Sequence, residues 1–484
     1  MIAFIPSNIL AILPEILLLV LGLLVLILDP FWKDESRRLN LGWLTAGGLF
    51  VILAVSLAVA RPGGAEPALI FGGMLRDDWL GFTFKMFFLF GAAITALFMM
   101  DVEHVGRRAE AYFLLLAAAL GMSLMASAAD LVMLYLAIET TSIPLYILAG
   151  FLTGDEKSTE SGFKYMLFGA LTSAVLLYGF SLIYGFSGET SLYALAASFP
   201  TLSLFALGTI FLVLVGLSFK VSLFPFHFWA PDVYEGAPTP VAGFLSTASK
   251  AAGFAVVLRL FMAAFPSLAA NWSLILAVLA TLTMTVGNLI ALTQKNIKRL
   301  LAYSSIAHAG YAMIGVVTFS QLGAASTVFY LIAYILTNLA AFGIVTAFGR
   351  VAGSDDVKAY YGLSRRAPTL ALMMLIAFLS LAGMPPFGGF VGKVFVFAAA
   401  IEQGWVWLAV VGVLNSIIGL YYYLTVLKYV YLYRMEGEEE EKHPIPLSRP
   451  YAIALTVLTI GIILVGVLFS PWFGLATGAA ANLF

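Results

Sequence analysis

The sequence contains no cysteine and only four histidines in its 484 residues. Without thiolates, the chain cannot bind an iron–sulfur cluster through cysteine or carry out thiol chemistry. The histidines form no HExxH motif and no pairing with carboxylates at metal-ligand spacing, so no metal site is predicted. GxGxxG and P-loop signatures are also absent, so we expect no cofactor-binding residues in this chain.

Charged residues are scarce as well. They make up 11% of the sequence, hydrophobic residues make up 62%, and the mean hydropathy is +1.00. A soluble globular chain is about half apolar and about a quarter charged, so this composition predicts an integral membrane protein surrounded by a lipid bilayer. The formal net charge is −1 and no basic block occurs, so nucleic acid is not an expected partner.

Long hydrophobic runs account for most of the chain. About 20 apolar residues in a helix cross the hydrocarbon core, so we expect an all-α polytopic membrane protein with about fourteen transmembrane helices. The runs cover 9–28, 41–60, 79–100, 110–126, 130–150, 162–186, 203–229, 240–264, 272–292, 299–318, 325–349, 368–401, 404–432 and 450–472. The first run has no basic segment before it and no AxA-like cleavage site, so we expect it to be retained as a span.

The loops between these runs differ sharply in basic residues. Every second loop, with its flanks, holds 17 of the 25 lysines and arginines, whereas the opposite loops hold only Arg61 and Arg76. By the positive-inside rule the basic side is cytoplasmic. An even number of spans then places both termini on the outer side.

Six basic residues remain inside the runs, namely Lys85, Lys164, Lys220, Lys250, Arg259 and Lys393. A charge at the centre of a spanning helix costs ~2.5–3.5 kcal/mol on insertion scales. Lys85 and Arg259 lie near the outer ends of their runs, where we expect the long side chains to reach the membrane surface. Lys164 lies two or three residues inside the cytoplasmic end, where the same behaviour is expected.

Four charged residues lie mid-span and cannot reach water easily: Glu139, Lys220, Lys250 and Lys393. They indicate either structural ion pairs or a proton or ion pathway, because buried lysines change their protonation state readily. His308 also lies near mid-span, with Tyr303, Ser304 and Ser305 one turn earlier. Alone it could be a satisfied polar group, but beside a line of lysines its near-neutral pKa favours a relay role.

Two runs are interrupted by proline at mid-membrane. Pro225 follows Lys220 in the seventh run, and Pro385 and Pro386 precede Lys393 in the twelfth. Proline removes a helical hydrogen bond, and the freed carbonyls in lipid need water or protein partners. Such broken helices mark ion sites in transporters.

The spacing of the two breaks suggests a repeated unit of five spans. The copies would cover 110–264 and 272–432, after an N-terminal three-helix segment (1–109) and before a cytoplasmic loop with a C-terminal helix (433–484). Because five is odd, the second copy would be inverted relative to the first. Two unrelated proline kinks remain the alternative.

A resemblance to a known family rests on four stretches. These are LAIETTSIPLYIL with Glu139, SFKVSLFPFHFWAPDVYEGAPTPVAGFLSTASKAAGFA with Lys220 and Lys250, KRLLAYSSIAHAGY with His308, and SLAGMPPFGGFVGKVF with Lys393. They are similar to the antiporter-like membrane subunits of respiratory complex I, and the similarity covers nearly the whole chain.

The resemblance implies inverted five-helix repeats with broken helices 7 and 12, and a role in proton translocation coupled to NADH:quinone electron transfer. By matching position, Glu139 and Lys220 correspond to the family's ion pair and Lys164 to its cytoplasmic-side lysine. Lys250 and His308 correspond to the central relay, and Lys393 to the residue toward the outer exit.

The same resemblance implies partners and a location. FMN, iron–sulfur clusters and quinone are expected in partner subunits, and the partners would be other membrane-arm subunits, antiporter-like and small. The expected location is the bacterial inner membrane, with both termini periplasmic. Other functions stay open: a cation/proton antiporter subunit, a subunit of a membrane-bound hydrogenase or plastoquinone reductase, or a non-enzymatic scaffold.

Overall fold

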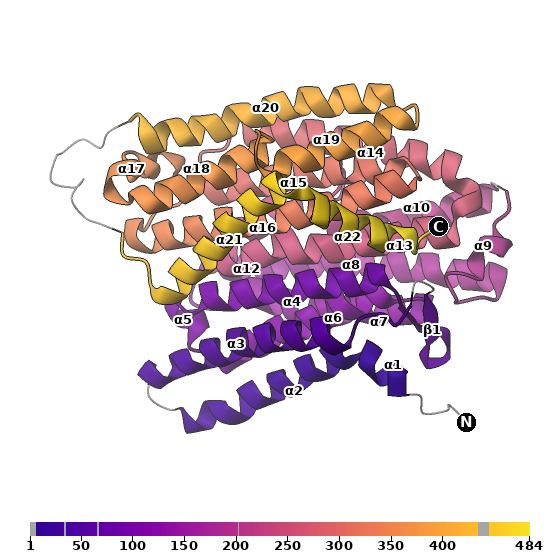
Figure 1. Ribbon diagram of the computed structural model, residues 1–484, viewed down its shortest axis with the longest axis horizontal. Coiled ribbons are helices and arrows are strands. Elements are labelled where there is room, and N and C mark those ends of the chain that lie inside the picture. Colours follow the sequence, from indigo (N-terminus) through magenta and orange to yellow (C-terminus); the bar gives the residue numbers. More distant parts are fainter. Residues whose placement is uncertain (1–5, 33–34, 65–66, 202, 434–444) are drawn as a thin grey trace.

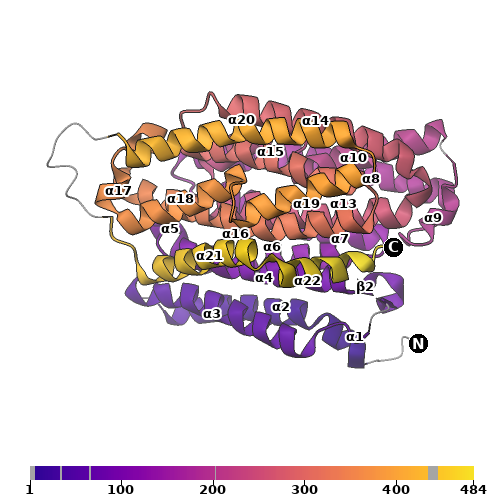
Figure 2. The ribbon, with the colours of Figure 1, turned by 45° about the horizontal axis from the view of Figure 1, so that its top comes forward.

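A computed structural model describes residues 6–32, 35–64, 67–201, 203–433 and 445–484. The long helices run roughly parallel to one axis (Figure 1). The chain ends marked N and C lie at the same end of this bundle, and α5 (Glu103–Gly106) and α17 (Leu363–Arg366) lie at the opposite end (Figures 1 and 2).

Three groups of elements follow one another before the C-terminal helices. The first comprises α1 (Pro6–Ala11), α2 (Leu13–Leu28), η1 (Asp29–Phe31), α3 (Glu35–Val59), β1 (Ala68–Ile70), η2 (Phe71–Gly73), β2 (Leu75–Asp77), α4 (Trp79–Met99) and α5. The second comprises α6 (Ala109–Ser127), α7 (Leu131–Ala149), α8 (Glu156–Ser187), α9 (Leu195–Ser198), α10 (Leu204–Val221), α11 (Trp229–Gly236), α12 (Thr239–Phe244), η3 (Leu245–Ser249) and α13 (Lys250–Ala264). The third comprises η4 (Pro266–Leu268), α14 (Ala269–Ala291), α15 (Ile297–Val317), α16 (Gln321–Ala352), η5 (Val357–Tyr360), α17, α18 (Pro368–Ala382), α19 (Gly388–Glu402) and α20 (Val406–Tyr431). The last helices are α21 (Arg449–Val467) and α22 (Phe469–Ala481).

The membrane topology follows the hydrophobic runs. Thirteen helical segments of the described chain are long and apolar enough to cross a membrane, and α18 is a shorter apolar helix. α18 and α19 together replace the twelfth predicted run. The prediction of a helical, multi-pass membrane protein with about fourteen spans is therefore confirmed, whereas the proposed repeat boundaries stay a prediction.

Polar residues begin many of these helices. The side chains of Asp78, Asp130, Asp155, Asn296 and Ser320 each accept a hydrogen bond from a backbone N–H in the first turn of the helix that follows. Such N-caps satisfy donors that have no partner within the helix. A small antiparallel hairpin, β1 with β2, precedes α4 and is the one departure from a wholly helical fold in the described chain.

The first break separates α10 from α11. α10 ends at Val221, and Ser222 adopts a left-handed conformation with φ +59°. The Leu223 N–H donates to the Ser218 carbonyl and the Ser222 N–H to the Phe219 carbonyl. This pair of bonds is a Schellman motif, so the helix ends four residues before Pro225 with two of its last carbonyls satisfied.

The second break repeats this arrangement between α18 and α19. Gly383 has φ +84°, the Met384 N–H donates to the Leu379 carbonyl, and the Gly383 N–H donates to the Ser380 carbonyl. The two breaks therefore share one hydrogen-bonding pattern, and each lies beside a lysine of the predicted relay.

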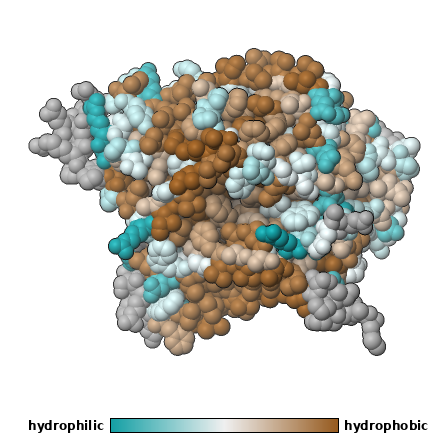
Figure 3. Space-filling model, in the orientation of Figure 1, coloured by the Kyte–Doolittle hydropathy of each residue, from teal (hydrophilic) through white to brown (hydrophobic). Residues whose placement is uncertain are grey.

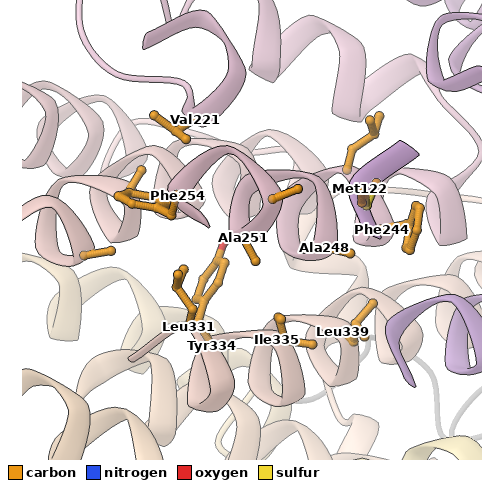
Figure 4. Packing of buried hydrophobic residues seen from close by; sticks show 14 of the residues in the cluster. Met122, Val221, Phe244, Ala248, Ala251, Phe254, Leu331, Tyr334, Ile335 and Leu339 are labelled. Carbon is orange, nitrogen blue, oxygen red and sulfur yellow. The ribbon is translucent and has the colours of Figure 1, made fainter. Parts of the chain in front are cut away.

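The core runs the length of the bundle, with α16 at its centre. Leu331, Ile335 and Leu339 of α16 point toward Phe244 and Ala248 of the α12–η3–α13 segment (Figure 4). Hydrophobic residues cover much of the outer surface in Figure 3, and hydrophilic residues gather mainly toward the two ends. Such a surface matches a protein whose middle is surrounded by lipid.

Two cations that we expected to reach the membrane surface are instead buried in ion pairs, so this prediction is wrong. Arg259 is 1% exposed, and its guanidinium lies 2.7 Å from a carboxylate oxygen of Asp78, which is 2% exposed. Lys85 Nζ lies 2.8 Å from the buried carboxylate of Glu15. Helices that pack outside the five-helix repeats supply Asp78 and Glu15, so neither cation faces lipid.

Candidate functional site

Four titratable side chains form the centre of the candidate site. Lys220, Lys250, His308 and Lys393 are 5%, 2%, 5% and 5% exposed. They come from α10, the start of α13, α15 and α19, and therefore from both halves of the bundle. Among the residues that the structure describes, no carboxylate forms an ion pair with any of the three lysines.

Lys220 lies in the last turn of α10, directly before the first break. Its Nζ donates to the Ser142 hydroxyl of α7 at 2.6 Å, and that hydroxyl donates to the Ile138 carbonyl at 2.5 Å. The position near a helix C-terminus favours a cation electrostatically.

Glu139 is half-buried on α7, three residues before Ser142. It accepts a hydrogen bond from Ser173 of α8. Glu139 and Lys220 form no ion pair in the described part of the chain. Lys220 of α10 reaches α7 at Ser142, three residues from Glu139. Ser142 holds Lys220 instead.

Lys164 lies on α8 with a third of its side chain exposed. Its Nζ is 2.6 Å from Asp232 of α11 and 2.6 Å from Glu160, one turn earlier on its own helix. The structure therefore separates Lys164 from the buried group and places it in a polar cluster at the Lys/Arg-rich end of the bundle.

Lys250 follows a π-helical turn, η3, which interrupts the eighth span. π-turns inside helices are frequent at functional sites. The Lys250 Nζ donates to the Ser305 carbonyl and to the Ser305 hydroxyl, both at 2.8 Å. It thus links the first five-helix unit to α15 of the second, one turn from His308.

His308 is held between two tyrosines. Its Nδ1 lies 2.7 Å from the Tyr330 hydroxyl and its Nε2 lies 3.2 Å from the Tyr423 hydroxyl. Tyr423 also shares a short hydrogen bond with Ser304. Since a neutral imidazole donates from one nitrogen and accepts at the other, this ring can take up a proton on one side and release one on the other.

Lys393 lies beyond the second break, on α19. Its Nζ donates to the carbonyls of Leu381 and Ala382 at 3.3 and 3.1 Å, and it lies 4.7 Å from the centre of the Tyr311 ring. The two carbonyls are those that the Schellman motif of α18 leaves free. Lys393 therefore satisfies the open end of α18, which the turn at Gly383 closes before Pro385 and Pro386.

A small cavity of about 10 Å³ joins His308 to this second break. Its lining includes Tyr330, Tyr334, Ser380 and Leu381. A cavity of this size is at the lower limit for one water molecule, and most of its lining is apolar although His308, Tyr330 and Ser380 border it. The cavity therefore lies between His308 and Leu381, whose carbonyl accepts a hydrogen bond from Lys393, and the hydroxyl groups of Tyr330 and Ser380 can bind water there.

Sequence reasoning missed the tyrosines that surround His308. Tyr330 and Tyr334 lie four residues apart on the otherwise apolar α16, and adjacent tyrosines occur at 422 and 423. Tyr334 stacks on His308 with 5.0 Å between ring centres. Paired tyrosines inside an apolar span were the available signal. Asp232 was also missed, because its loop-like PDVYEG sequence hides an eight-residue helix.

Comparison with known proteins identifies the family. The family model described as "NADH:quinone oxidoreductase/Mrp antiporter, TM" matches residues 128–419. The chain belongs to this family. The match includes the six predicted relay residues and ends shortly before Tyr423.

Individual relatives extend the similarity to the whole chain. NADH-quinone oxidoreductase subunit N of Moorella thermoacetica is 43% identical over 475 residues, covering 97% of this chain and 98% of the relative. The resemblance to the antiporter-like subunits of complex I is thereby confirmed, and this relative is a subunit N.

Solved structures agree. A chain of respiratory complex I from Thermus thermophilus has a TM-score of 0.81 at 35% identity, covering 96% of this chain and 99% of that chain. A chain of the Mrp complex from Dietzia sp. has a TM-score of 0.86 at 21% identity, covering 99% and 98%. The latter likeness concerns the fold alone.

Proposed function

We propose that this chain is a proton-translocating membrane-arm subunit of an NADH:quinone oxidoreductase. Electron transfer in partner subunits, which would hold FMN, iron–sulfur clusters and quinone, drives proton movement through this chain. The relay residues are Glu139, Lys164, Lys220, Lys250, His308 and Lys393. The names and structures of the relatives support the complex, and the chemistry of the buried residues supports the relay.

One observation carries the proposal: three buried lysines whose partners are uncharged. Lys220, Lys250 and Lys393 bind a hydroxyl or backbone carbonyls. A permanent charge without a counter-ion is costly in a low-dielectric interior. Lysines in such surroundings exchange protons readily, whereas Lys85 and Arg259, paired with carboxylates, are held charged.

The relay uses short proton transfers between neighbouring groups. A proton held on Lys220 passes toward Lys250, whose ammonium donates to Ser305. Ser305 lies one turn before His308 on α15. The imidazole takes up the proton at one nitrogen and releases its other proton toward a tyrosine. Lys393 receives it through the water-sized cavity and releases it toward the outer side.

Glu139 sets the direction of the cycle through the charge on Lys220. A carboxylate near the ammonium favours the protonated lysine, and moving it away lowers the lysine's affinity for the proton. The redox reaction in partner subunits would change this arrangement. The bundle end that carries α5 and α17, where the described Lys/Arg-rich loops lie, faces the cytoplasm (Figure 1), and protons leave at the end where both termini lie.

The test uses inverted membrane vesicles that contain the whole complex. Lys220→Ala is expected to assemble on a native gel and to lose NADH-driven proton uptake and NADH:quinone turnover together. Lys358→Ala, at an exposed position of the short helix η5, is the matched control and should behave as wild type. Normal uptake and turnover in assembled Lys220→Ala would remove Lys220 from the pump.

The alternatives make different predictions in the same vesicles. Sodium-dependent antiport without NADH would indicate a cation/proton antiporter subunit. A hydrogenase or plastoquinone reductase would show no NADH-driven uptake but would respond to its own electron donor. If simultaneous apolar replacement of Glu139 and Lys220 leaves every activity intact, a scaffold with structural charges is the better description.

A further inference from the structure

Six alternating charges form a chain at the Lys/Arg-rich end of the bundle. In order they are Lys157, Glu235, Arg299, Asp232, Lys164 and Glu160, and neighbouring nitrogen and oxygen atoms lie 2.6–3.0 Å apart. Three members belong to α8, two to α11 and one, Arg299, to α15. Except for Lys164, the relay makes no use of them.

Arg299 is the member that joins the two halves of the bundle. One of its guanidinium nitrogens lies 2.8 Å from Asp232 and 3.0 Å from Glu235. Both carboxylates belong to α11, the eight-residue half-helix beyond the first break. This one side chain of α15 therefore binds both carboxylates of the half-helix that follows the first break.

The opposite end of α11 carries an aromatic stack. Trp229 lies parallel to Tyr165 of α8, with 4.5 Å between ring centres, and its Nε1 donates to the Phe219 carbonyl at 3.1 Å. Phe219 directly precedes Lys220, and Tyr165 directly follows Lys164. The ion pairs and the ring stack thus share α8 and α11, and the rings lie beside α10, the helix that carries Lys220.

A cavity of about 190 Å³ adjoins the charges and not the rings. Its lining consists of Lys157, Glu160, Asp232, Glu235, Gly236 and Arg299. Trp229, Tyr165 and Phe219 are not part of this lining. Trp229 is 2% exposed and Tyr165 1%, so the buried stack can serve as a barrier between the cavity and Lys220.

α11 also approaches α8 at backbone distance. A Cβ atom added to Gly236 would lie 2.1 Å from the Lys157 carbonyl oxygen. Ser161 of α8 donates to the Val233 carbonyl at 3.0 Å. Close packing and ion pairs therefore hold the same half-helix by independent means, and each can be altered without the other.

We propose that Arg299 and Asp232 are positioning residues that seat α11 and thereby keep a gate closed between the cavity and Lys220. With α11 seated, Trp229 seals the barrier. With α11 released, the ring stack opens and water from this end reaches Lys220, which can then exchange its proton. This inference rests on the proposed proton-pumping function, because it supplies the uptake side of that relay.

Access of water to the break can be measured without any pumping assay. The chain has no cysteine, so Ser222→Cys gives this subunit a single thiol at a fully buried position two residues from Lys220. The intact complex, with the wild-type activity of Ser222→Cys checked first, is treated with a small water-soluble thiol reagent from the Lys/Arg-rich side. Labelling is read as a mass change of this subunit.

Arg299→Gln in the Ser222→Cys background should label faster. Arg299→Gln removes two charge-assisted hydrogen bonds between partly exposed groups, which together shift a closed–open equilibrium by roughly tenfold, and we expect labelling to accelerate by about that factor. Gly236→Ala should have the same effect through steric displacement alone. Lys298→Gln, whose partner Asp355 lies outside the chain of six, and Gly474→Ala, with no atom within 4 Å of an added Cβ, are the matched controls.

The same variants without the cysteine test coupling. Arg299→Gln should keep NADH:quinone turnover but move fewer protons per NADH, and a preformed proton gradient should decay faster than in wild type. If Arg299→Gln does not assemble, Arg299→Lys replaces it, because the ammonium keeps the charge while its different shape and stronger hydration change the contacts to the two carboxylates.

Two results would overturn the gate. One is unchanged labelling in both assembled variants, Arg299→Gln and Gly236→Ala. The other is equal acceleration in the two controls. Lys220→Ala, measured in parallel, separates this failure from a failure of the proposed function. If Lys220→Ala loses coupling while labelling is unchanged in Arg299→Gln and Gly236→Ala, the gate alone is refuted.

Discussion

Two kinds of buried cation occur in this chain, and their partners distinguish them. Arg259 and Lys85 contact buried carboxylates, and Lys85 also donates to the Ala11 carbonyl at 3.0 Å. Lys220, Lys250 and Lys393 contact hydroxyl groups, carbonyls or an aromatic ring. In the first kind, Arg259 links α13 to Asp78 before α4, and Lys85 of α4 pairs with Glu15 of α2 inside the N-terminal segment. The second kind lies along the proposed proton route.

Replacing a carboxylate-paired cation should therefore affect stability and leave coupling intact. Lys85→Met leaves Glu15 charged and buried, and breaking a buried pair from one side costs about 3–5 kcal/mol. We expect a lower thermal midpoint for the solubilised complex, with normal proton uptake per NADH in the fraction that survives. Thermal denaturation followed by native gel electrophoresis measures the first quantity.

A double replacement provides the control for Lys85→Met. Glu15→Gln with Lys85→Met removes both charges and keeps an acceptor for Ser123, which donates to Glu15 at 2.7 Å. Most of the lost stability should return. A fall in proton uptake per NADH that persists in the double variant would mean that this pair belongs to the proton route.

Tyr330 should matter for a different reason, because it is a proton partner of His308. Tyr330→Phe keeps the ring and removes the hydroxyl 2.7 Å from Nδ1. One hydrogen bond contributes about 0.5–1.5 kcal/mol, so we expect assembled complex with turnover and proton uptake slowed roughly threefold to tenfold. Tyr178→Phe, 59% exposed, is the control. Equal rates in Tyr330→Phe and wild type would place the route elsewhere.

At the scale of elements, the prolines indicated the breaks but not where the helices end. Pro225 and Pro385 pointed to the right spans, yet α10 and α18 end at Val221 and Ala382. The reason is the backbone conformation of Ser222 and Gly383. A left-handed residue closes each helix before the proline, and a serine at 222 gives no sequence signal for that conformation, whereas Gly383 does.

The length of α11 was also hidden in the sequence. The segment beyond Pro225 contains Pro231 and charged residues, which favour a loop by pattern alone. Tertiary contacts decide otherwise, because Asp232 and Glu235 bind cations of α8 and α15. Side-chain pairs between distant segments cannot be read from hydrophobic periodicity, and this explains why the charged chain was missed.

The seating of α11 should depend on pH in a defined direction. Partial burial raises the pKa of Asp232, but hydrogen bonds from Lys164 and Arg299 outweigh it and lower the pKa. Glu235 behaves alike, with Lys157 and Arg299 as the cations that lower its pKa. The seated state is therefore favoured fully above the ordinary carboxylate pKa of about 4, and this contribution is lost as the pH falls through the lowered values.

Labelling of Ser222→Cys measures this dependence, with rates corrected for thiol ionisation on an unfolded peptide. We expect no corrected change between neutral and mildly acidic pH, and faster labelling only below about pH 4. In Arg299→Gln the increase should begin at higher pH, because the carboxylates lose a cation that lowers their pKa. A corrected increase near pH 6 in wild type would instead indicate control by a histidine.

For the whole molecule, the sequence was informative about topology because lipid imposes simple rules. Every backbone group must be satisfied within a helix, so runs of apolar residues predict spans directly. The breaks and the four buried relay groups stood out for the same reason. The tyrosines around His308 did not, since an aromatic residue in an apolar span carries no charge penalty and its hydroxyl partners come from other helices.

The orientation of the bundle is the last prediction. Both chain ends lie at the end opposite α5 and α17 (Figures 1 and 2), and the basic loops lie with α17. By the positive-inside rule the chain ends face the periplasm. Alkaline phosphatase fused after Phe484 should therefore be active in cells, because it folds only where disulfides form, whereas green fluorescent protein at the same position should stay dark if exported unfolded.

The same two reporters inserted in the acidic loop 437–443, which lies outside the described residues, should give the reverse pattern and serve as the control. Fluorescence at the C-terminal position with an inactive phosphatase would invert the molecule. Protons would then leave on the side assigned here to uptake, and the charged chain of Arg299 and Asp232 would guard the exit.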